Sequence, residues 1–101
     1  MRLMLTLMFL CSLAFSQLMG IVAFTGSMYP TFRGGEHVVL EPANRASVGD
    51  IIVFQNGNHL VMHRVIFEFN GCHITKGDGE WLPDWGCADI LYKVEDQNSL
   101  V

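Results

Sequence analysis

The chain has 101 residues, half of them hydrophobic, and its 10 acidic and 6 basic side chains give a formal net charge of −4. This length predicts one small folded domain. The acidic balance and the lack of a basic cluster argue against nucleic-acid binding, which depends on Lys and Arg side chains that neutralise phosphates. We therefore expect no nucleic-acid partner, and we expect no cofactor.

The amino-terminal run, residues 2–24, is the longest apolar stretch and carries no charge after Arg2. About 20 apolar residues can span a bilayer as a helix. The run is longer than the hydrophobic part of a typical cleaved signal peptide, and Arg2 favours an amino terminus inside the cytoplasm. We predict a transmembrane signal-anchor helix over 1–24, followed by an extracytoplasmic β-rich domain over 25–101.

A cleaved secretory signal is the alternative interpretation of this run. Ala14 and Ser16 occupy the small-residue positions that a signal cleavage site requires. In that case, the mature protein begins at Gln17 and is secreted.

The chain after the apolar run changes to short segments rich in β-branched and aromatic residues, which is typical of strands. Turn residues separate them, and "NGN" at 56–58 and "NG" at 70–71 indicate tight hairpins. The pattern predicts a mainly β domain with a small antiparallel sheet. The expected strands cover 37–41, 51–55, 59–69 and 72–75.

His63 lies in the longest expected strand, where a two-residue period places it on one face with Val61, Val65, Phe67 and Phe69. A histidine on an apolar face either packs in the core or serves as a general base.

His59 is four residues away, about 13 Å along a strand at about 3.3 Å per residue. That distance is too long for His59 and His63 to share one ion, so we predict no metal site.

Two carboxylates are candidates for contact with His63. A two-residue turn at 70–71 pairs Phe69 with Cys72 and, by continuation, His63 with Asp78. Asp50 can also approach His63 across the turn at 56–58, or it can be an ordinary turn carboxylate.

Four short motifs follow the apolar run in a fixed order: "TGSMYPTF" at 25–32, "VGDIIVF" at 48–54, "VMHRVI" at 61–66 and "TKGDGE" at 75–80. Together they resemble the motifs of type I signal peptidases of the archaeal and endoplasmic-reticulum branch, in which a serine works with a histidine. The resemblance covers nearly all of the chain after the anchor. The segment "ADILYKVEDQ" at 88–97 resembles the closing strand of the family. The chain departs from the family at "GDGE", where G-D-N-N or a similar stretch is usual, at Tyr29, and at Tyr92, where glycine is typical.

The resemblance implies a membrane-bound serine endopeptidase in which Ser27 is the nucleophile and His63 is the general base. It also implies two functional aspartates, Asp78 and Asp84, of which Asp84 is the family's usual partner of the histidine. The pairing argument favours Asp78 instead, so the orienting acid stays open at this stage. Lys76 is a conceivable base, by analogy with the serine-lysine dyad of the bacterial branch, but it lies in the wrong motif.

The remaining site residues follow from the same resemblance. Thr25 and the backbone N–H of Ser27 form the oxyanion hole, and both hydroxyl and amide groups can donate to developing negative charge. Met28 and Pro30 shape the substrate-binding wall near the scissile bond.

The implied partners are signal peptides of secretory preproteins, the lipid bilayer and other membrane subunits. The implied location is a single-pass membrane protein with its catalytic domain on the extracytoplasmic or luminal side, and the aromatic residues in "WLPDW" at 81–85 suit a bilayer surface.

Two points stay open from the sequence. Cys72 and Cys87 lie where a disulfide can persist, but spacing does not decide whether they pair. The altered motifs and the short chain also fit a second function, namely a catalytically inactive, membrane-tethered β domain that binds partner proteins.

Overall fold

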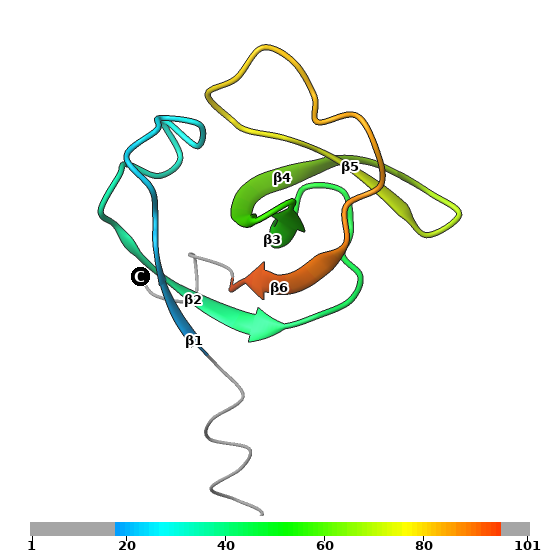
Figure 1. The fold of residues 1–101 in the computed structure, drawn as a ribbon, viewed down its shortest axis with the longest axis horizontal. Coiled ribbons are helices and arrows are strands. Elements are labelled where there is room, and N and C mark those ends of the chain that lie inside the picture. The colour runs from blue at the N-terminus through cyan, green and yellow to red at the C-terminus, as the bar shows by residue number, and fades with distance from the viewer. Residues whose placement is uncertain (1–17, 96–101) are drawn as a thin grey trace, which may run out of the picture.

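The computed structural model describes residues 18–95, and within that range it is mainly β. The strands form one antiparallel sheet in the order β1-β2-β6-β3-β4-β5 (Figure 1). Their bounds are β1 Leu18–Ile21, β2 His37–Pro42, β3 Ile51–Asn56, β4 His59–Phe69, β5 Cys72–Lys76 and β6 Ile90–Val94. The four strands predicted from residue pattern are confirmed, and β6 lies where the resemblance implied a closing strand.

Both tight hairpins form where the turn residues at 56–58 and 70–71 predicted them. Asn56 pairs with His59 across the β3–β4 turn, and Phe69 pairs with Cys72 across the β4–β5 turn. Asn70 and Gly71 both have positive φ, 48° and 79°. That combination is the one a type I′ turn requires, and it explains the Asn-Gly sequence.

Strand β1 was not predicted, because its residues fall inside the helix expected over 1–24. Leu18–Ile21 pair antiparallel with β2, from Leu18 opposite Leu40 to Ile21 opposite His37. The predicted helix is therefore wrong for this part. Val22, directly after the strand, is buried in the core, which draws the segment onto the domain. Residues 1–17 of the predicted anchor lie outside the described residues.

No helix in the part of the chain that the structure describes is long and apolar enough to cross a membrane.

The core lies on both faces of the central strand β3. Ile52 and Phe54 belong to one apolar cluster and Val53 to the other, because successive side chains of a strand point to opposite faces. The second cluster includes Met28 and Phe32, which are 2% and 1% exposed although they lie outside any strand. Burying such side chains stabilises a fold by about 1.5 to 3 kcal/mol each, so the loop that carries them is held firmly.

A bulge in β4 changes the predicted pairing. The register shifts between Val65, opposite Thr75, and Phe67, opposite Ile74, which leaves Ile66 as the extra residue. His63 and Val65 face the core as expected, but Phe67 and Phe69 are half exposed. The prediction that all of these side chains share one buried face is therefore wrong beyond the bulge.

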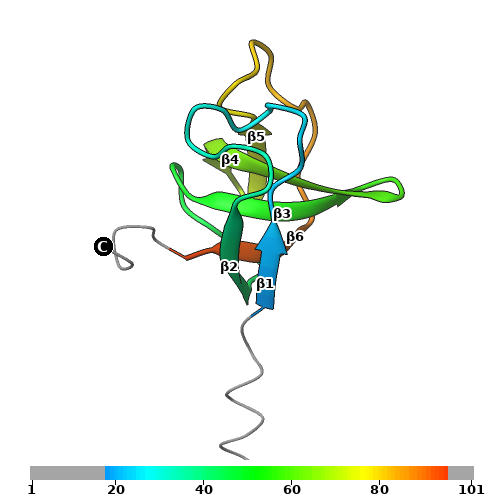
Figure 2. The same ribbon diagram turned by 90° about the vertical axis from the view of Figure 1, so that its left-hand side faces the viewer.

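Two long connections lie at the same end of the molecule. The segment between β1 and β2 and the segment between β5 and β6 both project away from the end where the chain enters β1, as Figures 1 and 2 show. These two segments carry Ser27 and both candidate aspartates, and they meet above β4, which carries His63.

Candidate active site

The loop that carries Ser27 is closed at its base and anchored by its own side chains. The Val22 N–H donates to Glu36 O and the Gly35 N–H to Val22 O, both at 2.8 Å. The buried side chains of Met28 and Phe32 anchor the loop in the core. Ser27 is only half buried, so its hydroxyl stays accessible on a fixed backbone.

Thr25 lies beside Ser27, as the oxyanion-hole prediction requires. The Thr25 hydroxyl donates to Ser27 Oγ at 3.2 Å, and the Ser27 N–H points to Thr25 Oγ1 at 3.3 Å. A hydroxyl and a backbone amide, the two donor types expected for an oxyanion, are therefore adjacent to the candidate nucleophile.

His63 is buried at 6% exposure on β4, with the ring of Phe54 edge-on to it at a centroid distance of 6.1 Å. Its Nδ1 contacts Asp84 Oδ2. Asp84 is held in turn by Thr75, whose hydroxyl donates to Oδ2 at 2.8 Å and whose carbonyl accepts the Asp84 N–H at 2.7 Å. A carboxylate at Nδ1 fixes the orientation and tautomer of an imidazole and leaves Nε2 for chemistry.

Asp78 does not contact His63, so the pairing argument that placed it there is wrong. The bulge at Ile66 moves the register by one residue and puts Arg64 opposite Lys76. Arg64 donates to Asp78 through Nε at 2.9 Å and Nη2 at 2.8 Å, and the Thr31 hydroxyl adds a third bond. The hydrogen bonds from Arg64 lower the pKa of Asp78 below its usual range, against the opposing effect of burial, and the bond from Thr31 adds to the lowering.

Asp78 thus joins the two halves of the candidate site. Thr31 belongs to the loop of Ser27, and Arg64 follows His63 on β4. Arg64 also donates to Gly49 O at 2.7 Å. Asp78 therefore has a positioning role, and it sets the distance between the Ser27 loop and the strand of His63.

Two glycines allow the turn after β5 to lie directly against the Ser27 loop. The Gly79 N–H donates to Ser27 O at 2.8 Å. A Cβ at Gly79 would collide with Gly26 O, and one at Gly77 would lie 2.5 Å from Ser27 O. Any side chain at either position would push the two segments apart.

Glu80 is the site residue that sequence reasoning missed. Its Oε1 lies 3.0 Å from His63 Nε2, whereas Asp84 contacts the other ring nitrogen, Nδ1. The signal available was its position in "GDGE", where the chain departs from the family that it resembles. Strand periodicity gives no information there, because Glu80 lies between β5 and β6 and belongs to no strand.

The other titratable candidates lie elsewhere. Asp50 accepts the Ser47 N–H at 2.9 Å and pairs with Lys93, so it is the turn carboxylate of the two interpretations. Lys76 donates to the carbonyls of Gly77 and Glu80, both at 2.8 Å, and does not reach Ser27. His59 starts β4 and is exposed, as expected for a residue that shares no site with His63.

A cavity of about 640 Å³ lies beside the candidate nucleophile and the candidate base. Ser27, Thr25, His63 and Glu80 line it together with Met28, and the rest of its wall comes mainly from apolar residues of β1 and β4. Pro30 is exposed and lies outside the lining. The cavity is suited to an apolar, extended ligand whose backbone reaches the Ser27 hydroxyl.

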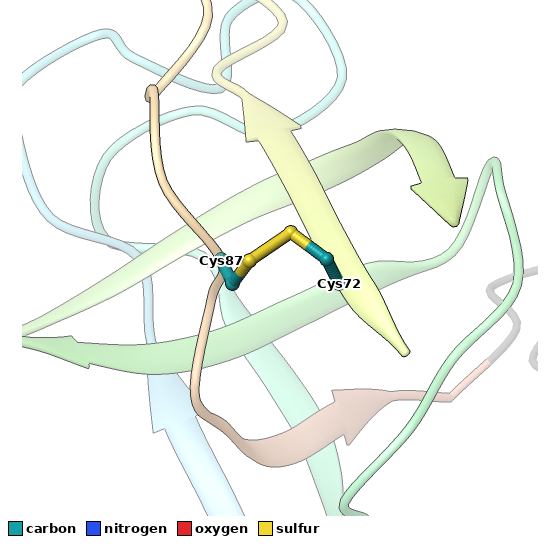
Figure 3. The surroundings of a disulfide bond; sticks show 2 residues. All are labelled: Cys72 and Cys87. Atoms are coloured by element: carbon teal, nitrogen blue, oxygen red, sulfur yellow. A yellow bond between two sulfur atoms is a disulfide. The ribbon is translucent and has the colours of Figure 1, made fainter. Parts of the chain in front are cut away.

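A disulfide between Cys72 and Cys87 joins the segment between β5 and β6 to strand β5 (Figure 3). It answers the question of pairing that the sequence left open. It joins residues 15 positions apart. The Ala88 N–H also donates to His73 O at 2.9 Å. Asp84 is therefore held by its two hydrogen bonds with Thr75 and by the disulfide that follows it in the chain.

Comparison of the chain with protein-family models, with curated proteins and with solved structures finds no match. The assignment of a function consequently depends on the motifs and on the geometry of the site.

Proposed function

We propose that this chain is a membrane-bound serine endopeptidase that cleaves signal peptides from exported preproteins after small residues, as a signal peptidase I. The observation that carries the proposal is the convergence of Ser27, His63 and Asp84. They come from three separate segments, and Ser27 and His63 line one apolar cavity while Asp84 contacts the far nitrogen of the imidazole.

The chemistry that we propose gives each of these groups a role. Ser27 Oγ attacks the scissile carbonyl while His63 Nε2 accepts its proton, and Asp84 stabilises the imidazolium through Nδ1. The Ser27 N–H and the Thr25 hydroxyl donate to the oxyanion of the tetrahedral intermediate. His63 then returns the proton to the leaving amine, and water hydrolyses the acyl-enzyme by the reverse sequence.

The proposed location is a single-pass membrane protein with its catalytic domain on the extracytoplasmic or luminal side. Trp81, Leu82 and Trp85 are 97%, 74% and 80% exposed in the segment next to the site. Aromatic side chains of this kind are suited to a bilayer surface, where a signal peptide is presented. The disulfide fits an oxidising compartment. The lipid bilayer, signal peptides and other membrane subunits are the proposed partners.

A second function, an inactive membrane-tethered β domain that binds partner proteins, also has an observation in its favour. The Ser27 hydroxyl is hydrogen-bonded to Thr25 and makes no hydrogen bond with His63, whose Nε2 faces Glu80. An active enzyme must turn Glu80 away before His63 can take the serine proton.

Cleavage of a model preprotein in detergent or liposomes separates the two functions. We expect the full chain to cleave after a small residue, and we expect Ser27→Ala and His63→Ala to reduce kcat by about 10⁴-fold or more, because nucleophile and base act as a unit. Circular dichroism of each variant checks that it folds.

Glu68→Gln is the matched control, because Glu68 is an exposed side chain of β4 outside the cavity. Its kcat should equal that of the wild type. A folded wild-type chain that forms no acyl-enzyme with an active-site serine probe and cleaves no preprotein, alone or with membrane extract, would favour the binding domain.

A further inference from the structure

His63 is flanked by two carboxylates. Asp84 Oδ2 contacts Nδ1, and Glu80 Oε1 lies 3.0 Å from Nε2. A neutral imidazole carries one N–H, so it can donate to only one of these oxygens. If the N–H is on Nδ1 and serves Asp84, the lone pair of Nε2 faces a carboxylate oxygen. Two electron-pair donors then lie close together, an arrangement that a cation bound to both atoms would stabilise.

The separation of the two atoms suits a transition-metal ion. Ligands at about 2.0 to 2.1 Å from one metal lie about 2.9 to 3.3 Å apart for bond angles between octahedral and tetrahedral values. The 3.0 Å between Nε2 and Oε1 falls within that range. One ligand atom each of His63, Glu80 and Asp84 lie within 4.8 Å of one another.

Asp84 has the position of an outer-sphere partner. It already engages Nδ1 of the ring and the Thr75 hydroxyl. Histidines that ligate metals through one nitrogen commonly donate the other N–H to a carboxylate, which orients the ring and makes it a better ligand. Asp84, His63 and Glu80 thus follow one another as carboxylate, imidazole and carboxylate.

Glu80 is free to serve as the second ligand. Its side chain is 44% exposed, and its one ionic contact within residues 18–95 is with His63. Lys76 binds the Glu80 backbone carbonyl, which leaves the carboxylate to the site. Glu80 and His63 both line the 640 Å³ cavity, so an ion can reach them from solvent.

We infer that His63 Nε2 and the Glu80 carboxylate form a binding site for a divalent transition metal, with Zn²⁺ the best match to one imidazole and one carboxylate ligand. Water, or the Ser27 hydroxyl on the same cavity wall, completes the coordination. Mg²⁺ and Ca²⁺ prefer all-oxygen sites and are not expected to bind. An ion on Nε2 occupies the lone pair that would accept the serine proton, so, resting on the proposed function, Zn²⁺ inhibits cleavage.

The test measures binding separately from activity. The protein for this test is the full chain with the substitution Cys11→Ser, which removes the cysteine outside the disulfide. It is labelled with ¹⁵N-histidine and studied in detergent micelles. Zn²⁺ titration is followed by the ring ¹⁵N resonances of His63 and by calorimetry. We expect saturable binding that shifts Nε2 of His63, and no such shift with Mg²⁺.

Three variants locate the site. Asp84→Asn should weaken binding about 10- to 100-fold, the usual effect of removing an outer-sphere partner, and Glu80→Gln should weaken it at least as much. Glu68→Gln, which changes an exposed carboxylate on the same strand as His63, should bind as the wild type does. Amide spectra of each variant check the fold.

Two results would overturn the inference: no change of the His63 resonances at millimolar Zn²⁺, or equal affinity of Glu80→Gln and wild type. If the wild type binds Zn²⁺ through Glu80 but cleaves no preprotein, the metal site stands and the proposed function fails. If the wild type cleaves preprotein but does not bind Zn²⁺, the proposed function stands and the metal site fails.

Discussion

The segment between β5 and β6 holds two aspartates whose surroundings differ completely. Asp78, near its start, receives hydrogen bonds from the guanidinium of Arg64 and the hydroxyl of Thr31. Asp84, six residues later, contacts the imidazole of His63 and the hydroxyl of Thr75. The first has a permanently charged partner, and the second has a partner that can gain and lose a proton.

This difference assigns different tasks to chemically identical side chains. An ion pair with Arg holds two segments at a fixed separation, and it involves no proton transfer under ordinary conditions. A carboxylate on a histidine can support general-base chemistry. Loss of Asp84 should therefore affect activity first, and loss of Asp78 should affect the fold first.

Among the changes that test this comparison, Asp84→Asn is expected to have the largest effect. The amide keeps the size of the side chain but cannot stabilise an imidazolium, so kcat for preprotein cleavage should fall by about 10³- to 10⁴-fold. The thermal unfolding temperature of the variant should change little, because the backbone hydrogen bond to Thr75 and the disulfide still hold the segment between β5 and β6. A near wild-type kcat for the Asp84→Asn variant would show that Asp84 is not the orienting acid.

The Cys72→Ser, Cys87→Ser double variant should show the next largest effect. A bridge across 15 residues constrains the unfolded chain and contributes about 3 kcal/mol to the free energy of unfolding. Urea denaturation of the double variant and of wild type, with and without a reductant, measures the difference. The reductant should lower the stability of wild type and leave the variant unchanged. Equal midpoints for the two proteins would contradict the expectation.

Asp78→Asn should destabilise the fold by about 2 kcal/mol at pH 7, because it breaks a charge-assisted pair and leaves Arg64 without its carboxylate. The folded-state pKa of Asp78 is lowered, chiefly by the Arg64 hydrogen bonds. Its contribution is therefore complete above the unfolded pKa of about 3.9 and is lost as the pH falls through the lower folded pKa.

Urea midpoints of wild type and Asp78→Asn, measured from pH 7 down to about pH 2, check this prediction. The two curves should converge in acid. A constant difference across that range would mean that the ion pair makes no contribution to stability.

Sequence pattern predicted most of the sheet but only part of the site. The β3–β4 hairpin followed from alternation and a Gly-containing turn, and its register is regular from Ile51 to Asn56. The β4–β5 hairpin began as expected at Asn70-Gly71, but the bulge at Ile66 shifted it by one residue. Extending the regular register past this bulge is what placed Asp78, in place of Asp84, beside His63.

Strand β1 and Glu80 escaped prediction for different reasons. The residues of β1 are apolar without alternation, so composition alone could not distinguish an edge strand from the end of a membrane helix. Glu80 lies in a glycine-containing turn, where no periodicity reports the direction of a side chain. Its contact with His63 depends on how the turn packs against the Ser27 loop.

The sequence by itself determined the strands, the tight turns and the order of the motifs, because these depend on neighbouring residues. Alternation sets which side chains face the core, and Gly57 and the Asn70-Gly71 pair supply the positive φ of the hairpin turns. The tertiary structure alone decided which carboxylate meets each nitrogen of His63. That outcome depends on a bulge, on two close backbone approaches at Gly77 and Gly79, and on a disulfide, all of which join residues distant in the chain.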